Sequence, residues 1–61
     1  MTFKIGDRVV NLRYWSNPIF VVTGFDGVQY SVTNGVETSW SLPKELVHEV
    51  IYNSPLYKAL K

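Results

Sequence analysis

Residues 18–41 of this 61-residue chain read PIFVVTGFDGVQYSVTNGVETSWS, and this stretch decides the fold. It holds three runs rich in Val, Ile, Phe, Tyr and Thr, residue types that favour β-strands. Asp26-Gly27 and Asn34-Gly35 separate the runs, and both dipeptides are strong hairpin signals because Gly adopts positive φ without a Cβ clash. We therefore expect a central three-stranded antiparallel meander with strands at about 18–25, 28–33 and 36–41.

Side-chain alternation predicts a register for the first hairpin of this meander. A two-residue turn at Asp26-Gly27 pairs residue 25 with residue 28. One face then carries the apolar side chains of Ile19, Val21, Phe25, Val28, Tyr30 and Val32. A one-residue slip would move every one of these side chains to the other face, so the pattern discriminates between registers. Phe20 and Val22 fall on the opposite face, where they indicate either a strongly bent sheet or a self-association surface.

The second hairpin is expected to close differently. A two-residue turn at Asn34-Gly35 would leave the core face half polar, with Trp40 on the wrong side of the sheet. A three-residue loop instead pairs Val32 with Val36, brings Trp40 into the core and keeps the face apolar. We therefore predict a type I turn with Gly35 left-handed in a G1 bulge.

The flanking segments complete a small sheet. Residues 2–12, TFKIGDRVVNL, predict strands at about 2–5 and 8–12 with a tight turn between them. Residues 42–46 are typical of a single 3-10 turn. Residues 47–52 fit either a helical stripe or a closing edge strand, and their β-branched side chains favour a strand over about 47–51. Ser54 as N-cap and Pro55 at the first helical position predict a helix over about 55–60, which is too short to be stable unless it docks.

The amino-acid composition limits the classes of protein to which this chain can belong. The chain is expected to form one domain over residues 1–61. With no cysteine and one histidine, His48, it has no disulfide and no zinc site. It is 46% hydrophobic and 15% aromatic, which supports a core. A domain this small buries only about 60% of its unfolded surface, so it depends on its aromatic side chains or on a partner subunit.

Charge and hydropathy exclude further classes. The net charge of +1 lacks the strongly basic character of a dedicated nucleic-acid binder. No apolar run reaches the length of a signal peptide core or a membrane span. We therefore expect a cytoplasmic protein without a membrane partner.

The order of segments permits a comparison with a known family. The chain opens with FKIGDRVV at residues 3–10, continues with a strand ending in Val-Thr-Gly, and has YSV at 30–32, VETSW at 36–40 and PKEL at 43–46. Over roughly residues 3–51 this order resembles the small SH3-like barrels, which include KOW-type domains and many short bacterial and bacteriophage proteins. The resemblance implies a mainly-β, five-stranded SH3-like barrel, to which the short C-terminal helix is an addition. It also implies a binding role, since such barrels bind RNA, DNA, peptides or each other.

Catalytic chemistry finds no support in the sequence. His48 and Glu49 are neighbours in the strand expected there, so their side chains point to opposite faces. No serine lies in a nucleophile-elbow pattern, and no glycine cluster precedes a helix as a phosphate-binding loop requires. We expect no enzymatic activity, no cofactor, no metal ion and no small-molecule substrate.

Residues 13–17, Arg-Tyr-Trp-Ser-Asn, form the best candidate for a binding loop. Arg, Tyr and Trp together have the composition of interface hot spots, and aromatic side chains beside cations also stack nucleic-acid bases. On the alternative reading, Tyr14 and Trp15 fold back to cover an open end of the barrel. Basic side chains at residues 4, 8, 13 and 44 either form one basic face or are simply solvated. The predicted binding surface comprises Arg8, Arg13, Tyr14, Trp15, Asn17 and Lys44.

The sequence therefore predicts a small binding module rather than an enzyme. The expected role is protein–protein interaction or self-association, with a protein partner or a second copy of the chain as the ligand. The alternative is a nucleic-acid-binding barrel that uses the aromatic and basic loop.

Overall fold

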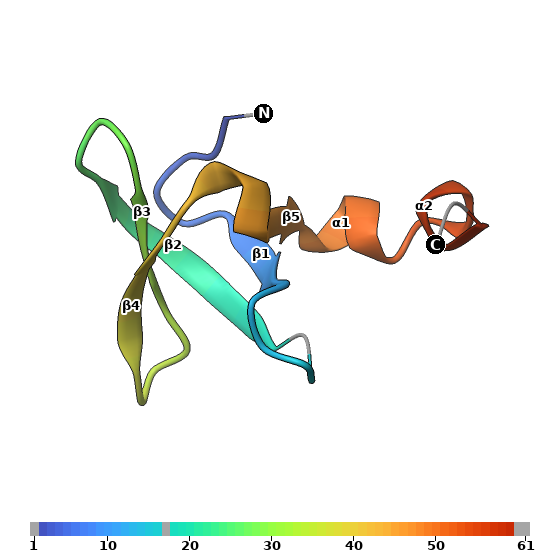
Figure 1. Cartoon of the computed structure of the whole chain (residues 1–61), viewed down its shortest axis with the longest axis horizontal. Helices are drawn as coiled ribbons and strands as arrows, with labels where there is room; N and C mark the ends of the chain where they lie inside the picture. Colours follow the sequence, from blue (N-terminus) through green and yellow to red (C-terminus); the bar gives the residue numbers. More distant parts are fainter. Residues whose placement is uncertain (1, 17, 60–61) are drawn as a thin grey trace.

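The computed structural model describes residues 2–16 and 18–59, and it confirms a mainly-β domain with a short C-terminal helix (Figure 1). The elements are β1 (Arg8–Asn11), β2 (Ile19–Phe25), β3 (Tyr30–Thr33), β4 (Thr38–Ser41), the 3-10 helix η1 (Pro43–Glu45), β5 (Leu46–His48), α1 (Glu49–Tyr52) and α2 (Pro55–Ala59).

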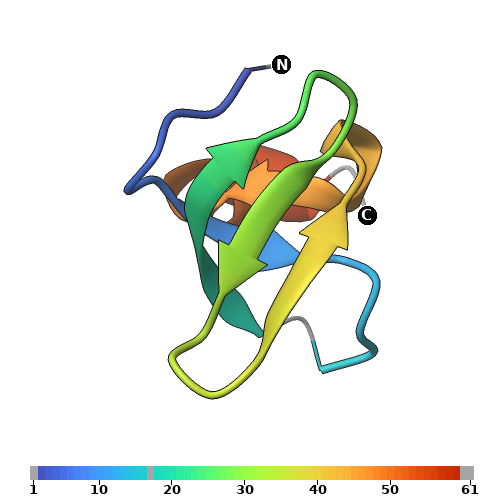
Figure 2. The same cartoon turned by 90° about the vertical axis from the view of Figure 1, so that its left-hand side faces the viewer.

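The five strands form one antiparallel sheet in the order β4-β3-β2-β1-β5. The central meander of β2, β3 and β4 is as predicted. Figure 2 shows β1 passing behind this meander, because the sheet is strongly bent. Among the described residues, β4 and β5 remain the two edges and do not pair, so the sheet does not close into the expected barrel.

The first hairpin closes through a four-residue loop, not through the predicted two-residue turn. The Asp26 side chain starts this loop, and its Oδ1 accepts the backbone N–H groups of Val28 at 2.8 Å and Gln29 at 2.7 Å. Gly27 has a φ of 102°, a conformation that glycine adopts without strain. The Asp26 carboxylate stabilises this wider loop, because it accepts hydrogen bonds from two of the backbone N–H groups of the loop.

A β-bulge in β2 overturns the predicted core face of that strand. The ladder pairs Val22 with Val32, and the register shifts between Val22 and Gly24. One inserted residue sends every side chain before it to the opposite face, so Phe20 and Val22 enter the core. The residues predicted for the core lie outside it: Ile19 and Val21 are half-buried, and Phe25 is exposed.

The second hairpin also has a four-residue loop where three residues were predicted. Gly35 is left-handed as expected, with a φ of 92°. The ladder, however, pairs Tyr30 with Ser41, so β4 turns its serines inward. This extra loop residue moves two predicted core side chains to the surface, Val36 and Trp40, as the wider first loop does for Val28.

The core lies on the concave side of the bent sheet. It consists of Phe3, Val9, Phe20, Val22, Tyr30, Val32 and Leu46. Two fully buried polar residues accompany it, Asn11 and Ser41, and Asn11 Nδ2 donates to Ser41 Oγ at 3.4 Å. This bond explains how β4 presents a serine to the interior, since buried polar groups need partners.

The N-terminal segment caps the core without forming the strand predicted at 2–5. Phe3 is buried, and its N–H donates to the hydroxyl of Tyr30 at 3.3 Å. The turn at Gly6 and Asp7 is hydrogen-bonded to β2. Gly6 N–H donates to the Val22 carbonyl at 2.8 Å, and Val22 N–H donates to the Asp7 carbonyl at 3.0 Å.

The C-terminal third matches the predictions in part. The predicted 3-10 turn is confirmed as η1, and the predicted helix is confirmed as α2, where Ser54 Oγ accepts the Tyr57 N–H at 3.1 Å. The segment 47–51 is divided, because the strand ends at His48 and α1 begins at Glu49. The helix over 55–60 was expected to dock, and α2 packs on α1 through the rings of Tyr57 and Tyr52, while both helices extend away from the sheet (Figure 1). Within residues 2–16 and 18–59, no helix has the length and apolar character needed to cross a bilayer.

Candidate protein-binding surface

The loop between β1 and β2 is held by backbone hydrogen bonds on both sides. Asn11 N–H donates to the Pro18 carbonyl at 3.0 Å, and Leu12 N–H donates to the Glu45 carbonyl of η1 at 2.8 Å. The buried Asn11 side chain also accepts the Arg13 N–H at 3.1 Å. The loop therefore has a fixed conformation at both ends.

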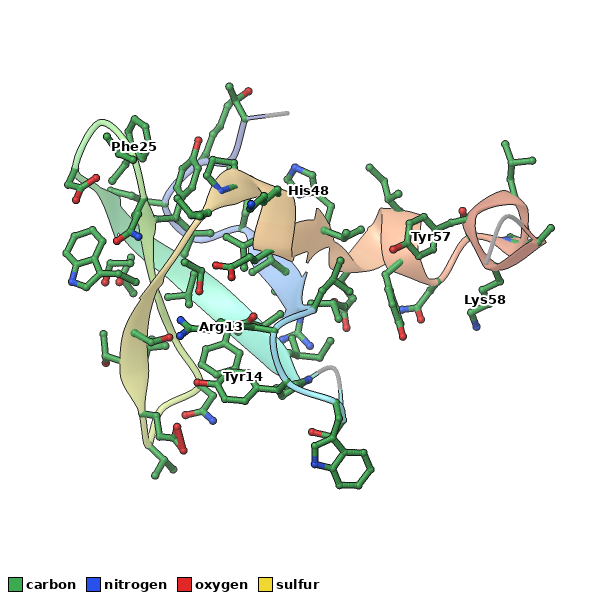
Figure 3. The ribbon with its side chains drawn as sticks, in the orientation of Figure 1. Arg13, Tyr14, Phe25, His48, Tyr57 and Lys58 are labelled. Atoms are coloured by element: carbon green, nitrogen blue, oxygen red, sulfur yellow. The ribbon has the colours of Figure 1, made fainter. Side chains whose placement is uncertain are left out.

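The two aromatic side chains of this loop have opposite environments. The Tyr14 ring stacks on Phe20, with centroids 5.8 Å apart and planes 5° from parallel. Trp15 points outward and is 96% exposed. Figure 3 shows Arg13 and Tyr14 extending from this loop toward the meander. The reading in which both aromatics cover the core is thus correct for Tyr14 and wrong for Trp15.

The loop between β3 and β4 presents a second exposed apolar side chain. Asn34 Oδ1 accepts the N–H groups of Val36 at 2.9 Å and Glu37 at 2.8 Å, and Thr33 Oγ1 accepts the Gly35 N–H at 3.1 Å. These bonds leave Val36 91% exposed at the tip. Its exposure is therefore fixed by the turn and not by chance flexibility.

A hollow of about 220 Å³ lies between the two loops. Its lining residues are Tyr14, Ser16, Pro18, Phe20, Asn34 and Glu37. We refer to these residues together with Trp15 and Val36 as the loop-end surface. The hollow is smaller than the roughly 300–1,000 Å³ of typical small-molecule pockets, and a size of this order suits one side chain of a protein partner.

The predicted site residues are brought together only in part. Arg13, Tyr14 and Trp15 share one loop, and the exposed Lys44 lies on η1, which contacts that loop. Arg8 lies elsewhere, on β1, where its guanidinium donates to Glu49 of α1 at 2.7 and 3.2 Å. Asn17, the remaining predicted residue, lies outside the described residues.

Both arginines of the predicted site have carboxylate neighbours. The hydrogen bonds from Arg8 hold the pKa of the Glu49 carboxyl below its ordinary value. Arg13 Nε lies 4.0 Å from the Glu45 carboxylate. Each of these two arginines therefore has a carboxylate near its positive charge.

Sequence reasoning missed five residues of the loop-end surface: Pro18 and Phe20 beside the candidate loop, and Asn34, Val36 and Glu37 of the second hairpin. The signal for the second hairpin was present in the sequence, because both hairpin loops contain an Asx-Gly-Val triplet, at 26–28 and 34–36. An Asx side chain that accepts two following N–H groups places the valine at the loop tip. The repeated triplet indicates that neither valine is in the core.

His48 has a structural environment. Its ring packs on Phe3 with centroids 4.6 Å apart, Nε2 lies 3.4 Å from the Thr2 carbonyl oxygen, and Nδ1 lies 3.8 Å from Asp7 Oδ2. These contacts fix the N-terminal segment against β5. Among the described residues, no cluster of three or more His, Cys, Asp or Glu side chains is arranged to hold a metal ion.

Comparison of the chain with models of known protein families, with curated proteins and with solved structures finds no match.

Proposed function

We propose that this domain is a small non-enzymatic module that binds a protein partner through the loop-end surface. The observation that carries the proposal is the exposure of Trp15, at 96%, on a loop whose ends are fixed by hydrogen bonds, beside a hollow that the stacked rings of Tyr14 and Phe20 help to line. Tryptophan is among the residues most enriched in interface hot spots. A loop whose ends are fixed also loses less conformational entropy on binding than a free loop, which favours affinity.

The charges around this surface favour a protein ligand over a nucleic acid. Glu37 lines the hollow, and Glu45 faces Arg13. Affinity for nucleic acids comes largely from cations that neutralise phosphates, and carboxylates at the same place oppose it. Arg13, the cation of the aromatic and basic loop, therefore has a carboxylate beside it, which weakens the support for the nucleic-acid alternative.

We also infer that the domain is SH3-like. The order of the five strands, the central meander, the strong bend and the 3-10 turn directly before the last strand support this proposal.

Selection of peptides from a random library on the immobilised domain tests the proposed function. We expect the selected peptides to lose about thirtyfold or more in affinity for Trp15→Ala, as the removal of a hot spot of about 2 kcal/mol implies. Trp40→Ala is the matched control, because Trp40 is an exposed tryptophan on β4, outside the loop-end surface.

Two outcomes would contradict the proposal. One is equal binding of the selected peptides to the wild type and to Trp15→Ala. The other is binding of single- or double-stranded nucleic acid at low salt that weakens steeply as salt is added, which would establish the alternative function.

A further inference from the structure

The C-terminal helices form an arm that leaves its apolar side chains in solvent. We define the arm as α1 and α2, residues 49–59. Neither helix has a buried residue, and Val50 and Leu56 are 82% and 74% exposed. Helices of four and five residues have little stability of their own, since isolated helices need about 12–15 residues to be even marginal. The arm is therefore the part of the molecule that gains most from a binding partner.

The arm has a defined direction and does not fold back on its own sheet. Asn53 N–H donates to the Glu49 carbonyl at 3.1 Å, Ser54 N–H donates to the Ile51 carbonyl at 3.0 Å, and Lys58 N–H donates to the Ser54 carbonyl at 3.1 Å. The rings of Tyr52 and Tyr57 lie 5.5 Å apart across the two helices. These contacts hold α2 against α1 and away from the sheet, and Figure 3 shows Lys58 on the part of the arm farthest from the strands.

A groove of about 420 Å³ lies at the base of the arm. Its walls are the turn at residues 6–8 and the segment 48–51, which includes Val50 and Ile51 of α1. The groove thus offers apolar side chains, and one of its walls belongs to the arm itself. Its ionic groups are the carboxylates of Asp7 and Glu49 and the guanidinium of Arg8, together with the imidazole of His48.

The charge of α2 complements the charge of the groove. The carboxylate of the arm, Glu49, lies at its base and lines the groove, whereas α2 carries one cation, Lys58, and no carboxylate. The groove carries the carboxylates of Asp7 and Glu49 against the one guanidinium of Arg8. The α2 helix of one copy is therefore attracted to the groove of another copy.

We propose that two copies of this chain associate by placing the arm of each in the groove of the other. Every copy has one arm and one groove, and the groove continues directly into α1. A two-fold axis beside α1 therefore brings α2 of the partner copy onto residues 6–8 and 48–51, and both sites are filled at once. Such an isologous arrangement closes at two copies and does not propagate. This inference concerns a different surface from Trp15 and does not depend on the proposed function.

Sedimentation equilibrium of the full chain, over concentrations from about 10 μM to about 1 mM, tests the association. We expect the average mass to rise with concentration toward that of two chains. Leu56→Asp introduces a charge on the apolar side of α2 and should keep the chain monomeric. Val36→Asp is the matched control at another strongly exposed position, in the loop-end surface, and it should associate as the wild type does.

Disulfide trapping tests which surfaces meet. Because the chain has no cysteine, the variants Asp7→Cys and Lys58→Cys each carry one thiol. A mixture of the two should form the mixed disulfide, between position 7 of one chain and position 58 of the other, in preference to either disulfide-linked homodimer. A mixture of Val36→Cys with Lys58→Cys should not show this preference.

Each of three results would overturn the proposal. The first is a monomer at all concentrations, and the second is a mass that rises beyond two chains. The third is a dimer that persists in Leu56→Asp and gives no mixed disulfide between positions 7 and 58, because that dimer would use another face. The trapping experiment remains decisive if Leu56→Asp is poorly folded. A Trp15→Ala variant that dimerises normally but loses its peptide ligands would separate this inference from the proposed function.

Discussion

Two valines in the second hairpin show how differently neighbouring residues contribute to stability. Val32 of β3 is 0% exposed, whereas Val36 at the loop tip is 91% exposed. We expect Val32→Ala to lower the free energy of unfolding by about 1.5–3 kcal/mol, from two lost methyl groups and the cavity they leave. Val36→Ala should change it by less than about 0.5 kcal/mol. Urea unfolding of both variants measures the difference, and equal losses would instead support the register predicted from the sequence.

Asp26 gives the stability of the domain a defined pH dependence. Hydrogen bonds from the Gln29 and Val28 N–H groups hold the pKa of its carboxyl below the ordinary value. The folded state therefore binds this proton less readily than the unfolded state. The resulting stabilisation is present above the unfolded pKa of about 3.9 and is lost as the pH falls through the lower folded pKa.

The variant Asp26→Asn tests this contribution. It keeps an acceptor oxygen, as Asn34 does in the other hairpin loop, but does not titrate. Between about pH 6 and about pH 2.5, the midpoint of urea unfolding should fall further for the wild type than for the variant. Glu49, whose pKa is also lowered, contributes equally to both proteins. Parallel pH profiles would show that the Asp26 bonds are not formed in solution.

At the scale of the elements, the sequence predicts which segments are strands better than it predicts their faces. The meander, the 3-10 turn and α2 follow from local chemistry: glycine in turns, proline at a helix start, β-branched strands. The side of the sheet that each residue faces depends on loop length and on the bulge in β2. A single added residue in a loop or a strand moves the side chains on one side of it to the opposite face of the sheet. The alternation of apolar and polar residues in the sequence is the same with or without the bulge and the Asx hydrogen bonds, so it does not reveal these added residues.

The division of residues 47–52 has a related cause. Leu46, Val47 and His48 form a strand because they pair with β1, and β1 has only four residues. The last pair of this ladder is His48 with Val9, one residue before the end of β1, and the chain continues as α1 from Glu49. The β-branched side chains are compatible with both structures, so the extent of the pairing with β1 decides where the strand ends. That extent is not encoded within residues 47–52 themselves.

The glycines of the first hairpin provide a test of the loop geometry. Gly27 has a φ of 102° with open space around it, so an added methyl group meets only backbone strain. We expect Gly27→Ala to destabilise the domain by about 1–2 kcal/mol. Gly24 lies in the strand without positive φ, and a Cβ there would sit 3.8 Å from Ser31 Cβ, an ordinary contact. Gly24→Ala should therefore leave stability unchanged or raise it by about 0.4–1 kcal/mol. Thermal unfolding compares the two, and a neutral Gly27→Ala would contradict the left-handed loop.

At the scale of the whole molecule, the candidate site is only partly visible in the sequence. Composition singles out residues 13–15, because Arg, Tyr and Trp are the residue types most enriched in interface hot spots. The other half of the loop-end surface comes from residues 34–37, about twenty positions away. The bend of the sheet brings these loops to the two sides of one hollow, and such proximity follows from tertiary structure alone.

The size of the chain makes the arm consequential for stability. A domain of this length buries only about 60% of its unfolded surface and is marginally stable alone. Association of two copies through the arms would stabilise the folded state by mass action, since the unfolded chain does not bind. We therefore expect the melting temperature of the wild type to rise with protein concentration.

The dependence of the melting temperature on protein concentration also distinguishes the arm from the other exposed apolar groups. For Leu56→Asp the melting temperature should be independent of concentration, and at high dilution it should match that of the wild type, because Leu56 contributes nothing to the core. Val36→Asp should keep the wild-type slope. Calorimetric scans over about a hundredfold range of concentration measure these slopes. For one binding site near saturation, such a range changes the free energy of unfolding by about 2.7 kcal/mol. If the wild-type slope were flat while Leu56→Asp melted lower at every concentration, Leu56 would stabilise its own chain, and the arm would be an intramolecular element.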